Sequence, residues 1–76
     1  KIQVQLNRAS RVSAVIYSID GRKIKTLHSG YLSAGEHNFI WNGRNEQNME
    51  AGSGVYILMF RVDNSNVFRK KLILLK

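Results

Sequence analysis

The chain has no cysteine and no proline. Without cysteine, neither a disulfide framework nor a thiolate metal site can form. Acidic residues are also scarce, because five Asp and Glu stand against twelve Lys and Arg, giving a formal net charge of +7. The basic residues are spread along the sequence. We therefore interpret the charge as a means of keeping a small domain soluble, and we expect no nucleic-acid partner.

Long apolar stretches are missing as well. No run of residues is long enough to cross a membrane, and no charged start followed by an apolar run marks a signal peptide. We therefore expect no membrane insertion. The 76 residues predict a single domain, 1–76, with too little volume for an enclosed active site. Because Lys1 is not a natural start residue, we expect this domain to be a fragment of a larger protein.

Apolar and polar residues alternate along most of the chain, which is the pattern of half-buried strands. The expected strands are residues 1–6, 11–18, 22–29, 36–42, 54–62 and 67–76. Nothing repeats at helical spacing, and residues 46–51 have room for one helical turn at most. Six to seven strands separated by turns about 8–12 residues apart predict an all-β fold, either an antiparallel β-sandwich or a small barrel.

Three local features refine this pattern. Asp20 and Gly21 predict a tight turn, because both residues tolerate the positive φ angles of hairpin turns. In the strand that follows, the alternation of apolar and polar residues slips between Ile24 and Leu27, which predicts either a β-bulge or the end of the strand there. Residues 31–34 lie between two glycines and are expected to form a loop.

Apolar side chains occupy both faces of the second expected strand. Val12, Ala14 and Ile16 share one side, and Val15 and Tyr17 share the other. This strand is therefore expected to be covered on both faces.

The aromatic residues divide into two groups. Trp41, Tyr56 and Phe60 are expected in the core, with Trp41 buried just ahead of a tight Asn-Gly turn. Tyr17 and Tyr31 are expected at the surface, where single aromatic residues are common.

Six short motifs follow one another in a distinctive order. They are residues 12–17, 20–24, 32–37, 41–45, 52–56 and 70–76, and their marker residues are Gly21, Gly35, Trp41, Gly43, Gly54 and Tyr56. Over residues 11–76 this order resembles the C-terminal sorting domain of cargo proteins of the bacterial type IX secretion system. It equally resembles the immunoglobulin-like domain of the flagellar hook-capping protein, which shares the pattern. Both resemblances imply an immunoglobulin-like sandwich.

The end of the chain favours the sorting domain, since such domains end on a lysine-bracketed apolar strand. The residues concerned are Lys70, Lys71, Leu72, Leu74 and Lys76, which the resemblance makes candidates for the export signal. The same residues are also typical of an edge strand that lysines protect against pairing with another sheet.

The sorting-domain resemblance implies a non-catalytic C-terminal module that directs export and surface attachment of a cargo protein. Its partners would be the type IX outer-membrane machinery and an N-terminal cargo domain of the same chain. The location would be the exterior or outer surface of a Gram-negative bacterium, reached through the periplasm. The alternatives are a structural immunoglobulin-like module, either hook-cap-like or a spacer or sugar-binding accessory of a secreted enzyme, and a small basic nucleic-acid-binding barrel.

The loop of residues 42–50 is rich in side-chain oxygen atoms and invites a calcium interpretation. Calcium prefers several carboxylates, and here only Glu46 and Glu50 supply them. We favour a turn in which asparagine side chains bond to the backbone. Asn48 stands where relatives usually have glycine, and asparagine tolerates the left-handed conformation.

The remaining residues do not suggest a catalytic site or a metal site. His28 and His37 could face each other across a hairpin, but they have no carboxylate or thiol at ligand spacing. No Ser, His and acid grouping suggests a triad. We therefore expect a protein that is not an enzyme and that uses no cofactor.

Overall fold

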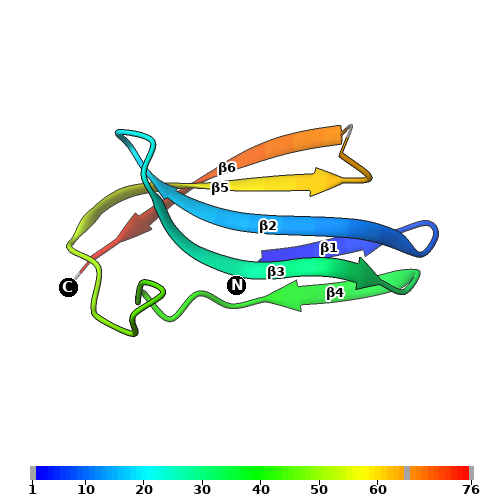
Figure 1. Ribbon diagram of the computed structural model, residues 1–76, viewed down its shortest axis with the longest axis horizontal. Coiled ribbons are helices and arrows are strands. Elements are labelled where there is room, and N and C mark those ends of the chain that lie inside the picture. The colour runs from blue at the N-terminus through cyan, green and yellow to red at the C-terminus, as the bar shows by residue number, and fades with distance from the viewer. Residues whose placement is uncertain (1, 65, 76) are drawn as a thin grey trace.

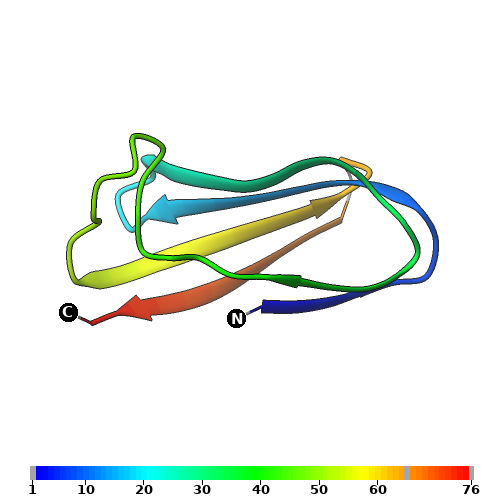
Figure 2. The same ribbon diagram turned by 90° about the horizontal axis from the view of Figure 1, so that it is seen from below.

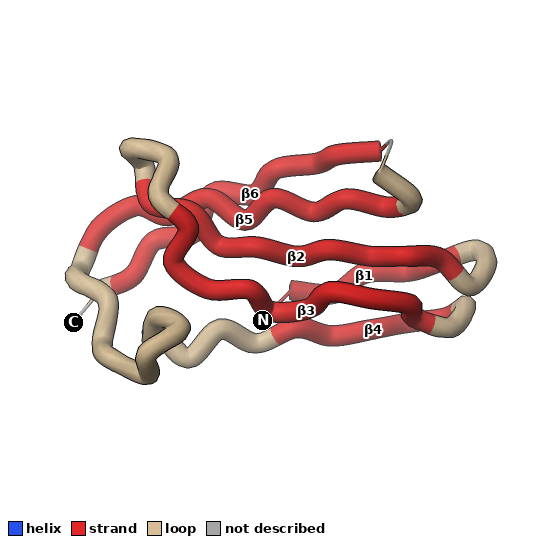
Figure 3. The backbone as a smooth tube through the Cα atoms, in the orientation of Figure 1, coloured by secondary structure: helices blue, strands red, loops and turns tan. Residues whose placement is uncertain are grey.

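The computed structural model describes residues 2–64 and 66–75, and its regular elements are all strands (Figures 1 and 3). They are β1 (Ile2–Leu6), β2 (Ser10–Ser18), β3 (Lys23–Leu32), β4 (Gly35–Phe39), β5 (Gly54–Val62) and β6 (Asn66–Leu74). No helix in this part of the chain is long and apolar enough to span a bilayer. The prediction of an all-β chain is confirmed.

The strands form two antiparallel sheets. β1 pairs with β4, and the larger sheet has the order β3-β2-β5-β6. Figure 2 shows the small sheet lying against one side of the large one. The fold is therefore the expected immunoglobulin-like sandwich and not a closed barrel, since β3 and β6 are the edges of the larger sheet.

The core lies between the two sheets and is built from alternate residues of three strands. Its buried apolar members are Ile2 and Leu6 of β1, Val12, Ala14 and Ile16 of β2, and Tyr56, Leu58 and Phe60 of β5. Phe39 of β4 closes the core from the small sheet, with its ring centroid 6.1 Å from that of Phe60. The buried residues of β2 and β5 follow period-two alternation, and Tyr56 and Phe60 lie in the core as predicted.

The predicted turn is present, and so is the irregularity predicted in the strand that follows it. Gly21 has a φ of 91° and donates its amide to the Ser18 carbonyl, closing the β2–β3 turn. In β3 the register with β2 shifts twice, once at Leu27 and once at Ile24. Both of these side chains consequently pack against the core, although strict alternation would separate them.

The ends of β3 and β4 differ most from the prediction, by three residues each. β3 continues through Gly30 and Tyr31 to Leu32, where a loop was expected, because Tyr31 pairs with Arg11 of β2. The Arg11 guanidinium also lies over the Tyr31 ring, 4.9 Å from its centroid, and this ring is 70% exposed. β4 begins at Gly35 and ends at Phe39, three residues earlier than expected, because the chain turns away there toward the loop.

The two histidines are strand residues and do not face each other across a hairpin, the arrangement that a zinc site would have needed. His28 lies on β3 opposite Ala14, whereas His37 lies on β4 opposite Val4, so the two residues belong to different sheets. Their ring nitrogens approach backbone carbonyls, His28 Nε2 that of Gly30 at 3.3 Å and His37 Nε2 that of Ser33 at 2.8 Å.

Candidate functional site

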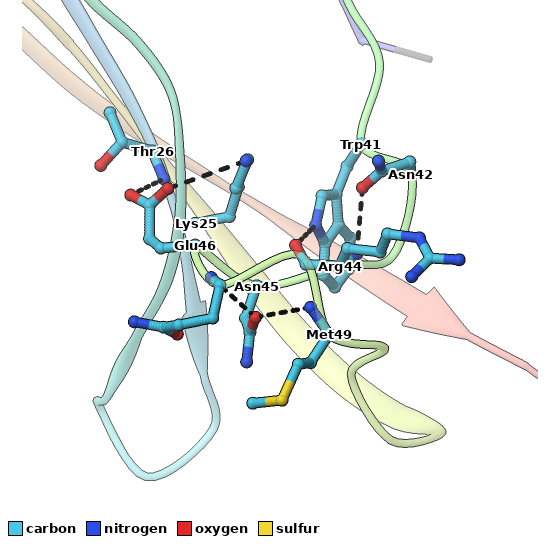
Figure 4. A network of polar contacts seen from close by, with 9 residues as sticks. Lys25, Thr26, Trp41, Asn42, Arg44, Asn45, Glu46 and Met49 are labelled. Carbon is cyan, nitrogen blue, oxygen red and sulfur yellow. Dashed lines mark hydrogen bonds and ion pairs between the residues drawn. The ribbon is translucent and has the colours of Figure 1, made fainter.

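The loop from residue 40 to residue 53, between β4 and β5, carries the best-defined part of the motif pattern. Two aromatic rings stand at its two ends and contact each other (Figure 4 shows Trp41). The ring centroids of Trp41 and Tyr56 are 5.0 Å apart in an edge-on arrangement. Trp41 Nε1 donates to the Arg44 carbonyl at 2.9 Å, and the Tyr56 hydroxyl donates to the Gly52 carbonyl at 2.6 Å. Each ring therefore also fixes the backbone of the loop.

Trp41 was predicted to be buried, but in the structure it is only half-buried. One side of the indole packs against the core, and a hollow of about 170 Å³ remains beside it, lined by Ile2, Leu72 and Leu74. The prediction took Trp41 as the end of a strand. In fact Ile40, the preceding residue, is 72% exposed, so the chain has already left the sheet at this point.

Asparagine side chains shape the interior of the loop, as the sequence suggested. Asn42 Oδ1 accepts the Arg44 amide at 3.0 Å, and Asn45 Oδ1 accepts the amides of Gln47 and Met49, both at 3.0 Å (Figure 4). Asn48 has a φ of 63°, the left-handed conformation that asparagine was expected to tolerate here. These oxygens are used by the backbone, and no three His, Asp or Glu side chains of the described residues gather as a metal site.

Glu46 ties the loop to the free edge of β3, which the sequence did not reveal. Its amide donates to the Ile24 carbonyl at 3.1 Å, and its Oε2 accepts the Thr26 amide at 3.0 Å. Lys25 Nζ lies 3.7 Å from Oε1 of the same carboxylate. The hydrogen bond from Thr26, assisted by the charge of Lys25, lowers the pKa of Glu46 below its ordinary value.

Arg44 closes the other side of the loop. Its guanidinium donates to the Asn48 carbonyl at 3.0 Å and lies 3.7 Å from a carboxylate oxygen of Glu50. Beside this pair, the Ala51 amide donates to the Gly43 carbonyl at 2.8 Å. The loop is therefore held from inside, by its own polar groups, as well as by bonds to β3 and to Tyr56 of β5.

The marker glycines serve different structural purposes. Gly43 is buried, has a φ of 78°, and would bring an added Cβ to 3.3 Å from Leu74 Cδ1. It therefore lets the loop pass close to β6. Gly21 turns the β2–β3 hairpin, whereas Gly35 and Gly54 begin β4 and β5.

The C-terminal residues form the edge strand β6, in agreement with the edge-strand interpretation. Leu72 and Leu74 are half-buried against the core. Lys70 and Lys71 are exposed and point to opposite faces, because Lys70 is opposite buried Leu58 and Lys71 is opposite Ile57 on the outer side. Lys76 lies outside the described residues. The export role of these residues stays a prediction that the geometry does not test.

Comparison with known proteins gives the family. Residues 1–65 match the family described as the FlgD Ig-like domain. Two basal-body rod modification proteins named FlgD, from Salmonella typhimurium and Salmonella typhi, are each 36% identical over 56 residues, which is 74% of this chain. The matched segment is 24% of each relative, so the chain spans about a quarter of the length of these relatives.

These relatives correct the expected location. The sorting-domain resemblance placed the protein at the outer cell surface after type IX export. The matching family and both relatives instead belong to the flagellum, where the relatives are named for modification of the basal-body rod. Of the two resemblances in the sequence, the hook-capping one is therefore supported, and the surface location is wrong.

Proposed function

Because the chain belongs to the FlgD Ig-like domain family, we propose that it is a non-catalytic structural module of a flagellar rod-modification protein of the hook-capping kind. The observation that carries the proposal is the match of residues 1–65 to this family. The 36% identity to two basal-body rod modification proteins points the same way.

The structure is compatible with a mechanical role. The long loop between β4 and β5 is bonded to itself through Trp41, to β3 through Glu46 and to β5 through Tyr56. In this role the partners are protein subunits of the flagellum, and the module contributes a rigid shape and surfaces.

A chimera tests the proposal. The matching segment of the Salmonella typhimurium relative is replaced by the whole 76-residue chain, which keeps β6, and the chimera is expressed in a strain that lacks its own copy. We expect the chimera to restore flagellar assembly and swimming, whereas the relative with the segment deleted serves as the baseline. A chimera that accumulates and folds normally but leaves the cells at this baseline would count against the proposed function.

A further inference from the structure

The outer face of the four-stranded sheet, which is turned away from β1 and β4, has an apolar centre. Val15 of β2 is opposite Met59 of β5, and Tyr17 is opposite Ile57. All four residues alternate with the buried core residues of the same strands, so they lie on the other face of the sheet, and all are half-buried. The sequence predicted that this face would be covered, but in Figure 2 the small sheet lies on the other side.

Cations flank this apolar centre at both edges of the sheet. On β6, Arg69 is opposite Met59 and Lys71 is opposite Ile57. On β3, Lys23 is opposite Tyr17. The three cationic side chains are exposed. One row across the sheet therefore consists of Lys23, Tyr17, Ile57 and Lys71, with a lysine at each edge.

The strands of the large sheet carry no carboxylate that balances Arg69 and Lys71, whereas Lys23 lies near Glu46 of the loop. The acidic residues of the chain are Asp20, Glu36, Glu46, Glu50 and Asp63, and none lies in β2, β3, β5 or β6. The ion pairs of the described residues involve Arg8, Arg22, Lys25 and Arg44 instead. Arg69 and Lys71 therefore present positive charge beside apolar surface without a neighbouring anion within the described part of the chain.

A hollow at one end of this face is shaped for an apolar side chain. It has a volume of about 280 Å³, and its lining includes the apolar side chains of Tyr17, Ile19, Ile57 and Met59 together with Arg69. Ile19, in the β2–β3 turn, is 76% exposed. Exposed apolar surface bordered by polar groups is typical of interaction sites.

We propose that this face binds an acidic, apolar segment of another protein. An apolar side chain of the partner fills the hollow, and its carboxylates pair with Arg69 and Lys71, so that shape and charge are complementary. A second copy of the chain fits less well, because two such faces would oppose cations to cations at a net charge of +7 each. The proposal goes beyond the flagellar role and does not depend on it, since it rests on this face alone.

The test uses a short synthetic peptide in which leucine and glutamate alternate, titrated into the isotope-labelled 76-residue chain and followed by NMR. We expect saturable shifts centred on the amides and methyl groups of Ile57 and Met59. Two control peptides separate the contributions: one carries lysine for glutamate, and the other carries serine for leucine. Both controls are expected to bind at least tenfold more weakly, a difference of about 1.4 kcal/mol.

Variants of β6 supply a matched comparison. Arg69→Gln and Lys71→Gln each remove one charge from the outer face, and each is expected to weaken binding of the leucine–glutamate peptide by about threefold. Lys70→Gln removes the same charge from the same strand but from the opposite face. Its affinity for the peptide should equal that of the parent chain. Circular dichroism of each variant checks that the fold is retained.

Three results would overturn the proposal. One is equal binding of the leucine–glutamate peptide and either control peptide. Another is an equal effect of the Lys70 and Lys71 substitutions, which would show a general charge effect. The third is a response of Ile57 and Met59 to phosphatidylglycerol vesicles or to concentration of the chain alone, with none to the peptide; this would assign the face to a lipid surface or to a second copy.

Discussion

Trp41 and Tyr56 join the two ends of the longest loop through a direct edge-on contact between their rings, 5.0 Å between centroids. Each residue also donates a hydrogen bond to a loop carbonyl, Trp41 to Arg44 and Tyr56 to Gly52. The pair therefore sets both the separation of the loop ends and the path of the backbone between them.

Trp41→Ala should lower the free energy of unfolding by about 3 kcal/mol, the lower end of the range for large aromatic residues, because the indole is only half-buried. Trp41→Phe should cost about 1–2 kcal/mol, since it keeps a ring on Tyr56 but removes the bond to the Arg44 carbonyl. Urea unfolding of both variants measures the difference. A nearly unchanged midpoint for the alanine variant would show that the ring contact contributes little.

Gly43→Ala should destabilise the fold by about 1–2 kcal/mol. The residue has a φ of 78°, where a Cβ is strained, and the added carbon would lie 3.3 Å from Leu74 Cδ1. Gly52→Ala is the control in the same loop, because nothing lies within 4 Å of its added Cβ and its φ is not positive. We expect that control to stay within about 0.5 kcal/mol of the parent. Thermal unfolding that ranks the two alike would contradict the strain argument.

Asn48 offers a test of backbone conformation without side-chain packing. With a φ of 63°, Asn48→Ala should cost about 1 kcal/mol, whereas Asn48→Gly should be neutral or slightly stabilising. The carbonyl that accepts the Arg44 guanidinium is retained in both variants. In chemical unfolding, the alanine variant should therefore have a lower free energy of unfolding than the glycine variant. The reverse order would mean that the loop relaxes out of the left-handed conformation.

Glu46 should make the stability of the domain depend on acid pH. Because the folded state lowers the pKa of this carboxyl, its contribution is complete above the ordinary value of 4.5 and is lost as the pH falls through the lower folded value. Glu46→Gln should therefore lower the urea midpoint at pH 7 and flatten its decline below about pH 4.5. Glu36→Gln on β4 removes the same charge away from Thr26, and it should leave the slope of the parent curve intact.

The sequence predicted the two central strands best, for a physical reason. β2 and β5 are paired on both sides, so regular alternation of residues such as Ile16 and Leu58 reports their burial directly. An irregularity in β3 was also visible, because Ile24 and Leu27 break the alternation that a regular strand requires, although the sequence did not distinguish a bulge from a strand end.

The boundaries that failed depend on contacts that local sequence does not contain. Gly30 was taken as the end of a strand, but pairing with β2 carries β3 past it to Leu32. Phe39 and Trp41 have the parity of one strand, yet the chain leaves the sheet between them. Neither outcome follows from propensity, since tertiary pairing decides both.

The candidate surfaces were predictable to different degrees. The asparagine bonds of the loop are local and follow from the residue types at positions 42, 45 and 48. The bond between Glu46 and Thr26 spans twenty residues and has no periodic signature. The cationic outer face requires the strand order and the register of β6, which place Arg69 and Lys71 beside Met59 and Ile57.

The contact of Glu46 with β3 makes the two edges of the large sheet differ in their capacity to pair with another strand. Backbone groups of Ile24 and Thr26 on one edge are already bonded to the loop, and bulges interrupt the same edge. β6 keeps a regular register over nine residue pairs with β5 and leaves its other side open. If two copies of the domain joined through β6, both remaining edges would be the obstructed ones, so the association would stop at a closed pair and could not extend into a fibre.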